Sequence, residues 1–156
     1  MVRPRSIAID RSVRVSRHLA LLLAAVLITV PVLGSRAEAL TSDETTFSTM
    51  MNEVRSNHSV RRLKVTQRLS KMARKHSSRM AERGELYHSN LRRMLRGFDY
   101  RVVGENVGYA ASLDQLLDAF LDSPPHAENL LGRWRRTGVG VVWRGGKIWV
   151  TQLFLA

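Results

Sequence analysis

The chain has 156 residues and no cysteine, and its 25 Lys and Arg against 13 Asp and Glu give a formal net charge of +12. This length favours a single domain, and the lack of cysteine excludes both disulfide bonds and a thiol-linked lipid anchor. Arginines outnumber lysines by 21 to 4. Because guanidinium groups suit phosphate and carboxylate, the composition is compatible with anionic partners such as lipid head groups, cell-envelope polymers or nucleic acid. The alternative interpretation is a solvated basic surface without a specific partner.

Residues 1–39 have the pattern of a secretory signal peptide. Five arginines precede the uncharged apolar run Leu19–Leu33, and Ala37-Glu38-Ala39 matches the small-x-small pattern of a cleavage site. We therefore predict a signal peptide over 1–39 and an exported domain over 40–156. The alternative is an uncleaved anchor, although the run is shorter than the roughly 20 residues that span a bilayer. Export argues against nucleic acid as a partner, and it limits membrane contact to the N-terminal segment if that segment stays attached.

The first half of the domain predicts two amphipathic helices. The first begins at a capping box formed by Thr41 and Glu44 and ends near Ser56. Its apolar residues, at the i, i+3, i+4 and i+7 spacing of one helix face, are Phe47, Met50, Met51 and Val54. Residues 57–64 are polar and basic and indicate a loop, and a second helix is predicted over 65–83.

The middle of the chain is less regular. Residues 88–101 predict a loop with one helical turn near 91–95, and residues 100–107 are expected to be extended. Ser112 and Gln115 form a second capping box before another apolar helix stripe.

The C-terminal third ends in a β-hairpin. The prolines of Asp122-Ser123-Pro124-Pro125 end the preceding helix, and a short helix is expected over 126–131. Residues 139–143 and 148–154 then alternate around Gly145-Gly146, a pair suited to a two-residue turn. Both faces of the hairpin are apolar, so helices should cover both sides. These elements predict an α+β fold, a single-domain α/β/α sandwich with a central antiparallel sheet flanked by helices.

Four segments then follow one another with a recognisable order and spacing. They are Met80-Ala81-Glu82-Arg83-Gly84 with Tyr87-His88-Ser89, Gly104-Glu105-Asn106-Val107, Ser123-Pro124-Pro125-His126-Ala127-Glu128-Asn129, and Thr137-Gly138-Val139-Gly140-Val141 with Trp149-Val150-Thr151-Gln152-Leu153-Phe154. Together they resemble the CAP family, the cysteine-rich secretory, antigen 5 and pathogenesis-related-1 group. The chain looks most like the short bacterial branch that lacks cysteine. The resemblance implies the family's α/β/α sandwich and a central cleft.

The resemblance also implies which residues line that cleft. Many members have two histidines and two acidic residues there, and some bind a divalent metal such as zinc. Carried over by motif, the histidines are His88 and His126, the expected metal ligands, and the first acid is Glu105. The second acid falls at Arg93, and a guanidinium neither ligates a metal nor acts as a base at ordinary pH. The four-residue set is therefore incomplete in this chain.

The residues themselves leave two interpretations of this cleft open. Imidazole is the commonest metal ligand in proteins, and Glu105 would then act as a further ligand or fix a histidine tautomer. In the other interpretation the histidines only form hydrogen bonds in a polar cleft. Asn106 and Asn129 are expected to line the same cleft and to bind backbone there. His76 lies on the apolar face of the second helix and is expected to be a core residue.

Three functions fit these observations. The first is a non-catalytic extracellular binding module for a lipid, an envelope polymer or an extracellular protein. The second is a metal-assisted hydrolase or peptidase with Glu105 as general base. The third is an interaction protein without a small ligand. Ser89 and Ser123 do not lie in a Gly-x-Ser-x-Gly elbow, so a serine hydrolase is not indicated. We favour the binding module because Arg93 removes one acid from the cleft.

Overall fold

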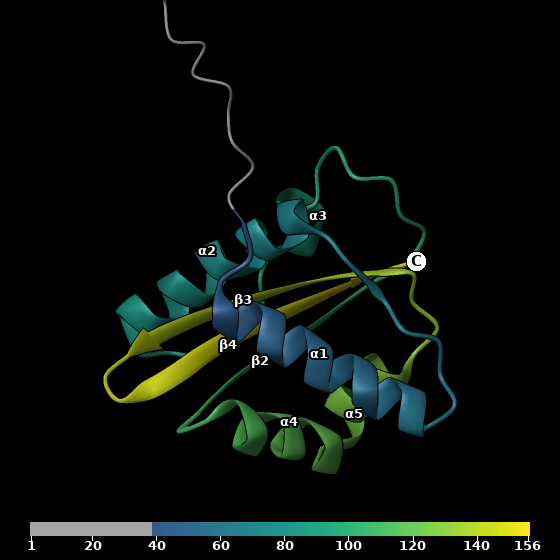
Figure 1. Cartoon of the computed structure of the whole chain (residues 1–156). Coiled ribbons are helices and arrows are strands. Elements are labelled where there is room, and N and C mark those ends of the chain that lie inside the picture. Colours follow the sequence, from purple (N-terminus) through teal and green to yellow (C-terminus); the bar gives the residue numbers. More distant parts are fainter. Residues whose placement is uncertain (1–38) are drawn as a thin grey trace, which may run out of the picture. The chain divides into compact units, whose positions relative to one another are not determined.

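The computed structural model describes residues 39–156 (Figure 1). Apart from Ala39, the predicted signal peptide lies outside the described residues. In chain order the elements are α1 (Ser42–Asn57), β1 (Lys64–Val65), α2 (Gln67–Arg83), α3 (Leu91–Met94), β2 (Val103–Ala110), α4 (Leu113–Asp122), α5 (Pro124–Leu131), β3 (Arg136–Arg144) and β4 (Lys147–Leu155). Among these described residues, no helix is both long and apolar enough to cross a membrane.

The strands form one mixed sheet in the order β1-β3-β4-β2. The three long strands are antiparallel, whereas β1 pairs with β3 in parallel. The antiparallel prediction is therefore right for β2, β3 and β4 and wrong for β1, where the sequence predicts a loop and a helix start. A two-residue strand is too short to show alternation. The hairpin is confirmed, because Gly145 and Gly146 have φ values of 61° and 72°, as both central residues of a type I′ turn require.

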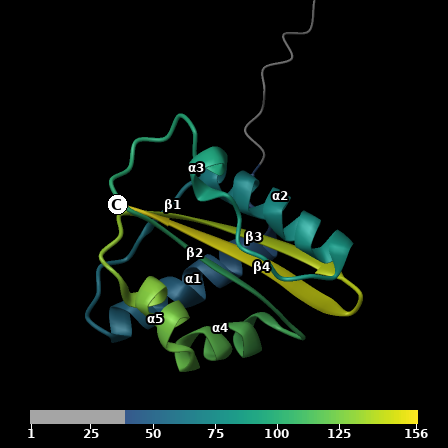
Figure 2. The same ribbon diagram turned by 180° about the vertical axis from the view of Figure 1, so that it is seen from behind.

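Helices cover both faces of the sheet (Figures 1 and 2). Along β4, Ile148, Val150 and Phe154 pack into the core formed with α1 and α4. Leu153 and Leu155 belong to the core on the other face, with α2. This alternation confirms an α+β fold in which both faces of the hairpin are buried. Since β2 is an edge strand, it is the strand around which a site can gather residues from both layers.

Two glycines of β3 let α2 lie directly on the sheet. A Cβ at Gly140 would stand 1.9 Å from the backbone N of Arg74, and one at Gly138 would stand 2.4 Å from the carbonyl C of Leu69. Ser70 Oγ accepts a hydrogen bond from the Val139 amide at 3.0 Å, buried between the two elements. The backbone contact fixes α2, and with it the segment that follows α2 along the chain.

Helix ends agree with the sequence apart from three corrections. α2 begins at Gln67, two residues after the predicted start, because Val65 belongs to β1. The Thr41–Glu44 capping box is confirmed. At α4, Ser112 Oγ accepts from the Gln115 amide, but the Gln115 side chain accepts from the Ala111 amide rather than from the N-cap. α5 begins at Pro124, two residues before the predicted start, because a proline is tolerated in the first turn, where its missing N–H has no helical partner.

Candidate functional site

Glu105 is a buried carboxylate on the α2 side of β2. The next-but-one residue, Val107, packs with Met80 of α2, which places Glu105 on the same face. Glu105 Oε2 accepts a hydrogen bond from the Ser89 amide at 2.9 Å and lies 2.8 Å from His88 Nδ1. The Glu105 side chain is 1% exposed and that of His88 is 64% exposed. The carboxylate therefore holds His88 from beneath while the imidazole faces solvent.

Asn106 points to the opposite face of β2 and binds α5. Its Nδ2 donates to the carbonyl of His126 at 3.1 Å. Asn129 Nδ2 donates to Asn106 Oδ1 at 2.9 Å and to the Glu105 carbonyl at 3.2 Å. The two amides thus bind backbone, as the sequence predicts, and they fix α5 against β2. Their role here is to position His126.

His126 lies in the first turn of α5. Its Nδ1 lies 2.8 Å from Ser123 Oγ, and its ring stacks on Phe120 with a centroid separation of 4.9 Å. Burial lowers the pKa of His126, and the charge of His88 lowers it further. The two histidines belong to the two helical layers on either side of the sheet, His88 after α2 and His126 on α5. The lowered pKa favours a neutral His126 imidazole.

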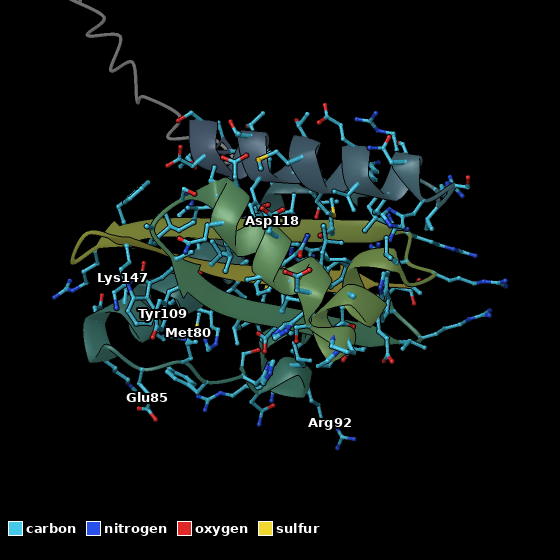
Figure 3. All side chains as sticks on the ribbon, turned by 90° about the horizontal axis from the view of Figure 1, so that it is seen from below. Met80, Glu85, Arg92, Tyr109, Asp118 and Lys147 are labelled. Atoms are coloured by element: carbon cyan, nitrogen blue, oxygen red, sulfur yellow. The ribbon has the colours of Figure 1, made fainter. Side chains whose placement is uncertain are left out.

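A pocket of about 500 Å³ opens beside His88, between α2 and residues 87–94. Its lining includes the cations Lys75, Arg79, Arg83 and Arg93, and it includes no Asp or Glu. Arg92, next to Arg93 on α3, does not line the pocket and projects outward (Figure 3). His76 also reaches the pocket, but it is 2% exposed and its Nε2 lies 2.8 Å from the Tyr87 carbonyl. It is the core histidine that the sequence predicts.

The basic side of this pocket is the part of the site that the sequence interpretation missed. Lys75, Arg79 and Arg83 recur every four residues, a spacing that places them on one helix face. That signal is visible in the sequence, where it resembles a solvated charged face. Only the fold of residues 87–94 onto α2 turns the stripe into the wall of a pocket.

A comparison with models of protein families identifies the family of this chain. The model of the cysteine-rich secretory protein family, CAP, matches residues 49–154. The chain belongs to the CAP family. Among curated protein sequences, none matches this CAP protein.

Solved structures share the fold. An outer surface protein of Borrelia burgdorferi has a TM-score of 0.68 and 17% identity, and the match covers 76% of this chain and 95% of that one. An extracellular SCP-domain protein of Bacillus anthracis has a TM-score of 0.64 and 23% identity, covering 76% of this chain and 44% of its own. A cysteine-rich secretory protein of Staphylococcus aureus has a TM-score of 0.64 and 22% identity, covering 72% and 38%. At these identities the likeness concerns the fold alone.

The donor set of the cleft falls short of a complete metal centre. Within residues 39–156, no group of three or more His, Cys, Asp or Glu side chains is placed to hold a metal ion. Catalytic zinc sites use three protein ligands. His88 and His126 would supply two imidazoles, with Glu105 orienting the first of them, as carboxylates beside metal-bound histidines do. A metal held there would supply positive charge to a ligand.

The cleft also lacks the geometry of a serine hydrolase. Ser123 contacts His126 at Nδ1, the nitrogen that in a catalytic triad faces the acid, while the nucleophile faces Nε2. Glu105 is bound to His88, not to His126. The Ser123–His126 contact joins residues three apart at the start of α5 and is explained by the local helix geometry.

Proposed function

We propose that this CAP protein is exported and acts as a non-catalytic binding module for anionic ligands of the cell envelope. The supporting observation is the distribution of charge. Residues 67–101, which include α2 and α3, carry ten Lys and Arg against three Asp and Glu, a net charge of +7. Residues 40–156 together carry 19 against 11, a net charge of +8. Nearly all of the excess therefore belongs to one helical layer.

The other helical layer has the opposite character. α4 contains three aspartates and no basic residue, and Asp118 is one of them (Figure 3). A protein with this polarity presents its basic face to an anionic surface, because the summed potential steers association. Exported location supports the same assignment. Residues 1–39 have a signal-peptide pattern, and the similar Bacillus anthracis and Borrelia burgdorferi proteins are described as extracellular and outer surface proteins.

A vesicle sedimentation assay tests the proposal. The purified protein is mixed with phosphatidylcholine vesicles that contain or lack phosphatidylglycerol, and separately with immobilised poly(glycerol phosphate), at low and high salt. We expect binding to the anionic surfaces at low salt and release at about 0.5 M salt, where the screening length falls to about 4 Å. An absence of binding to both anionic surfaces at low salt would contradict the proposal and favour an extracellular protein as the partner.

Matched triple variants locate the binding face. Lys75→Gln/Arg79→Gln/Arg83→Gln removes three charges from α2, and a control removes three exposed arginines outside residues 67–101. The control substitutions are Arg61→Gln, Arg62→Gln and Arg133→Gln. The α2 variant should lose binding and the control should retain most of it. Equal loss in both variants would show a dependence on net charge alone.

A further inference from the structure

The pocket between α2 and residues 87–94 concentrates positive charge from two directions. Lys75, Arg79 and Arg83 lie one above another on α2, and Arg93 comes from α3 on the facing segment. Like charges at i and i+4 repel one another and slightly destabilise a helix. Four cations around one concavity of about 500 Å³ therefore carry an electrostatic cost that an anionic ligand would remove.

No carboxylate neutralises these cations within residues 39–156. None of Lys75, Arg79, Arg83 and Arg93 forms an ion pair with a described acidic side chain. Arg83 lies over the Tyr87 ring at 5.1 Å. Glu105 is buried behind His88 and is bound by His88 and the Ser89 amide. The charges on the pocket wall are thus left to solvent or to a ligand.

Polar residues of the lining suit hydroxyl groups, and Met72 and Met94 add apolar surface beside them. Asn90 Oδ1 caps α3 by accepting from the Arg93 amide at 2.9 Å, so its Nδ2 stays available as a donor. Ser89 and the exposed imidazole of His88 add further polar groups. The pocket falls in the size range of sites for small organic molecules, so it has room for a phosphate together with the group that carries it.

We propose that this pocket binds the phosphate ester of a small polyol. Arg79 and Arg93 hold the phosphate from opposite walls, since guanidinium forks bind phosphate oxygens in pairs. His88, Ser89 and Asn90 face the hydroxyl groups. The proposal rests on the proposed function and names its ligand chemistry. The same chemistry occurs in a phosphatidylglycerol head group and in a poly(glycerol phosphate) chain, and the two sources are separated experimentally.

Calorimetric titration with glycerol 3-phosphate at low salt tests the site, with glycerol as the uncharged control. We expect Arg93→Gln and Arg79→Gln each to weaken binding about tenfold or more, as loss of a charge-assisted hydrogen bond does. Arg92→Gln removes the same charge from the same short helix outside the pocket and should change affinity less than about threefold. Arg93→Lys should lie between Arg93→Gln and the wild type, because an ammonium lacks the fork.

Three outcomes would contradict the proposal that this pocket binds a polyol phosphate. They are no heat with glycerol 3-phosphate, equal loss in the Arg92 and Arg93 variants, or equal binding of glycerol. Urea unfolding of each variant checks that the fold is kept, and the α2 variant Arg79→Gln is an independent test if the α3 variant unfolds.

Competition by glycerol 3-phosphate separates the two sources. It should displace the protein from vesicles if the ligand is a head group, and from poly(glycerol phosphate) if the ligand is a polymer. If glycerol 3-phosphate displaces the protein from neither the vesicles nor the polymer, the proposed ligand of the pocket is wrong. Vesicle or polymer binding that persists while glycerol 3-phosphate fails to bind would leave the proposed function standing without this site.

Discussion

Arg55 is a fully buried arginine near the end of α1. Its Nε donates to the Arg61 carbonyl at 2.8 Å, and its Nη1 donates to the carbonyls of Leu130 and Gly132. Burial lowers the pKa of Arg55. One guanidinium therefore connects α1 with the chain after α1 and with the end of α5. The amphipathic pattern of α1 gives no sign of this role, because the three acceptors are backbone carbonyls outside the helix.

Replacement of Arg55 should destabilise the protein. Arg55→Met leaves three carbonyls without their donor, and unsatisfied buried polar groups cost about 1–3 kcal/mol each, so we expect a loss of about 3 kcal/mol in the free energy of unfolding. Urea unfolding measures it. Exposed Arg62→Met is the matched control and should change stability by less than about 0.5 kcal/mol. Equal stability of the two variants would contradict the assigned role.

The lowered pKa of His126 predicts a pH dependence of stability. The unfolded chain, with a histidine pKa near its ordinary value of 6.5, binds a proton more readily than the folded protein. Stability is therefore fully present above that value and falls as the pH drops toward the lower folded pKa. In buffer with a chelator, the unfolding midpoint of wild type should decrease more between about pH 8 and about pH 5 than that of His126→Gln. Exposed His58→Gln should follow wild type, whereas parallel curves for all three would contradict the prediction.

The predicted zinc site is tested at His88 and His126. Two imidazoles completed by water form a weaker site than the three protein ligands of a catalytic centre. We expect calorimetry to show weak zinc binding to wild type and none to His88→Ala/His126→Ala. Equal heats in the two proteins, whether large or negligible, would contradict zinc binding by His88 and His126.

At the scale of the element, the packing of α2 on β3 depends on glycine. The substitution Gly140→Ala would place a Cβ 2.2 Å from the Ala73 carbonyl C and 1.9 Å from the Arg74 N. These are backbone atoms, so no side chain can move aside, and we expect a loss at or above the upper end of the 1–3 kcal/mol typical of overpacking, about 3 kcal/mol. Arg144→Ala, at the exposed end of the same strand, is the control. An unchanged unfolding midpoint for Gly140→Ala would mean that α2 lies farther from the sheet.

The elements that the sequence predicts well are those with a repeating pattern. The stripe of α1 and the alternation of the hairpin each extend over several residues that bury one face. β1 and the start of α5 depend on features with no period, namely a two-residue parallel pairing and the tolerance of Pro124 in a first helical turn. Motif resemblance points to His88, Glu105 and His126, which the structure groups around β2, but it carries no information about the basic wall of α2.

At the scale of the whole molecule, the two helical layers differ in charge, and the sheet keeps them apart. The hairpin end offers a competing surface. Trp143 is 56% and Tyr109 45% exposed, and Lys147 lies over the Tyr109 ring at 4.4 Å (Figure 3). Exposed aromatic and basic residues together also suit a membrane interface. An anionic ligand can therefore bind at either of two surfaces. One is the basic layer of residues 67–101, and the other is the hairpin end with its exposed aromatic rings.

Backbone amide chemical-shift mapping with poly(glycerol phosphate) distinguishes these two surfaces most directly. Binding at the basic layer predicts shifts concentrated in residues 67–101, largest around Arg79 and Arg93, and small shifts in α4 and at the hairpin turn. Shifts centred on Tyr109 and Lys147, or an unchanged spectrum at low salt, would contradict the account.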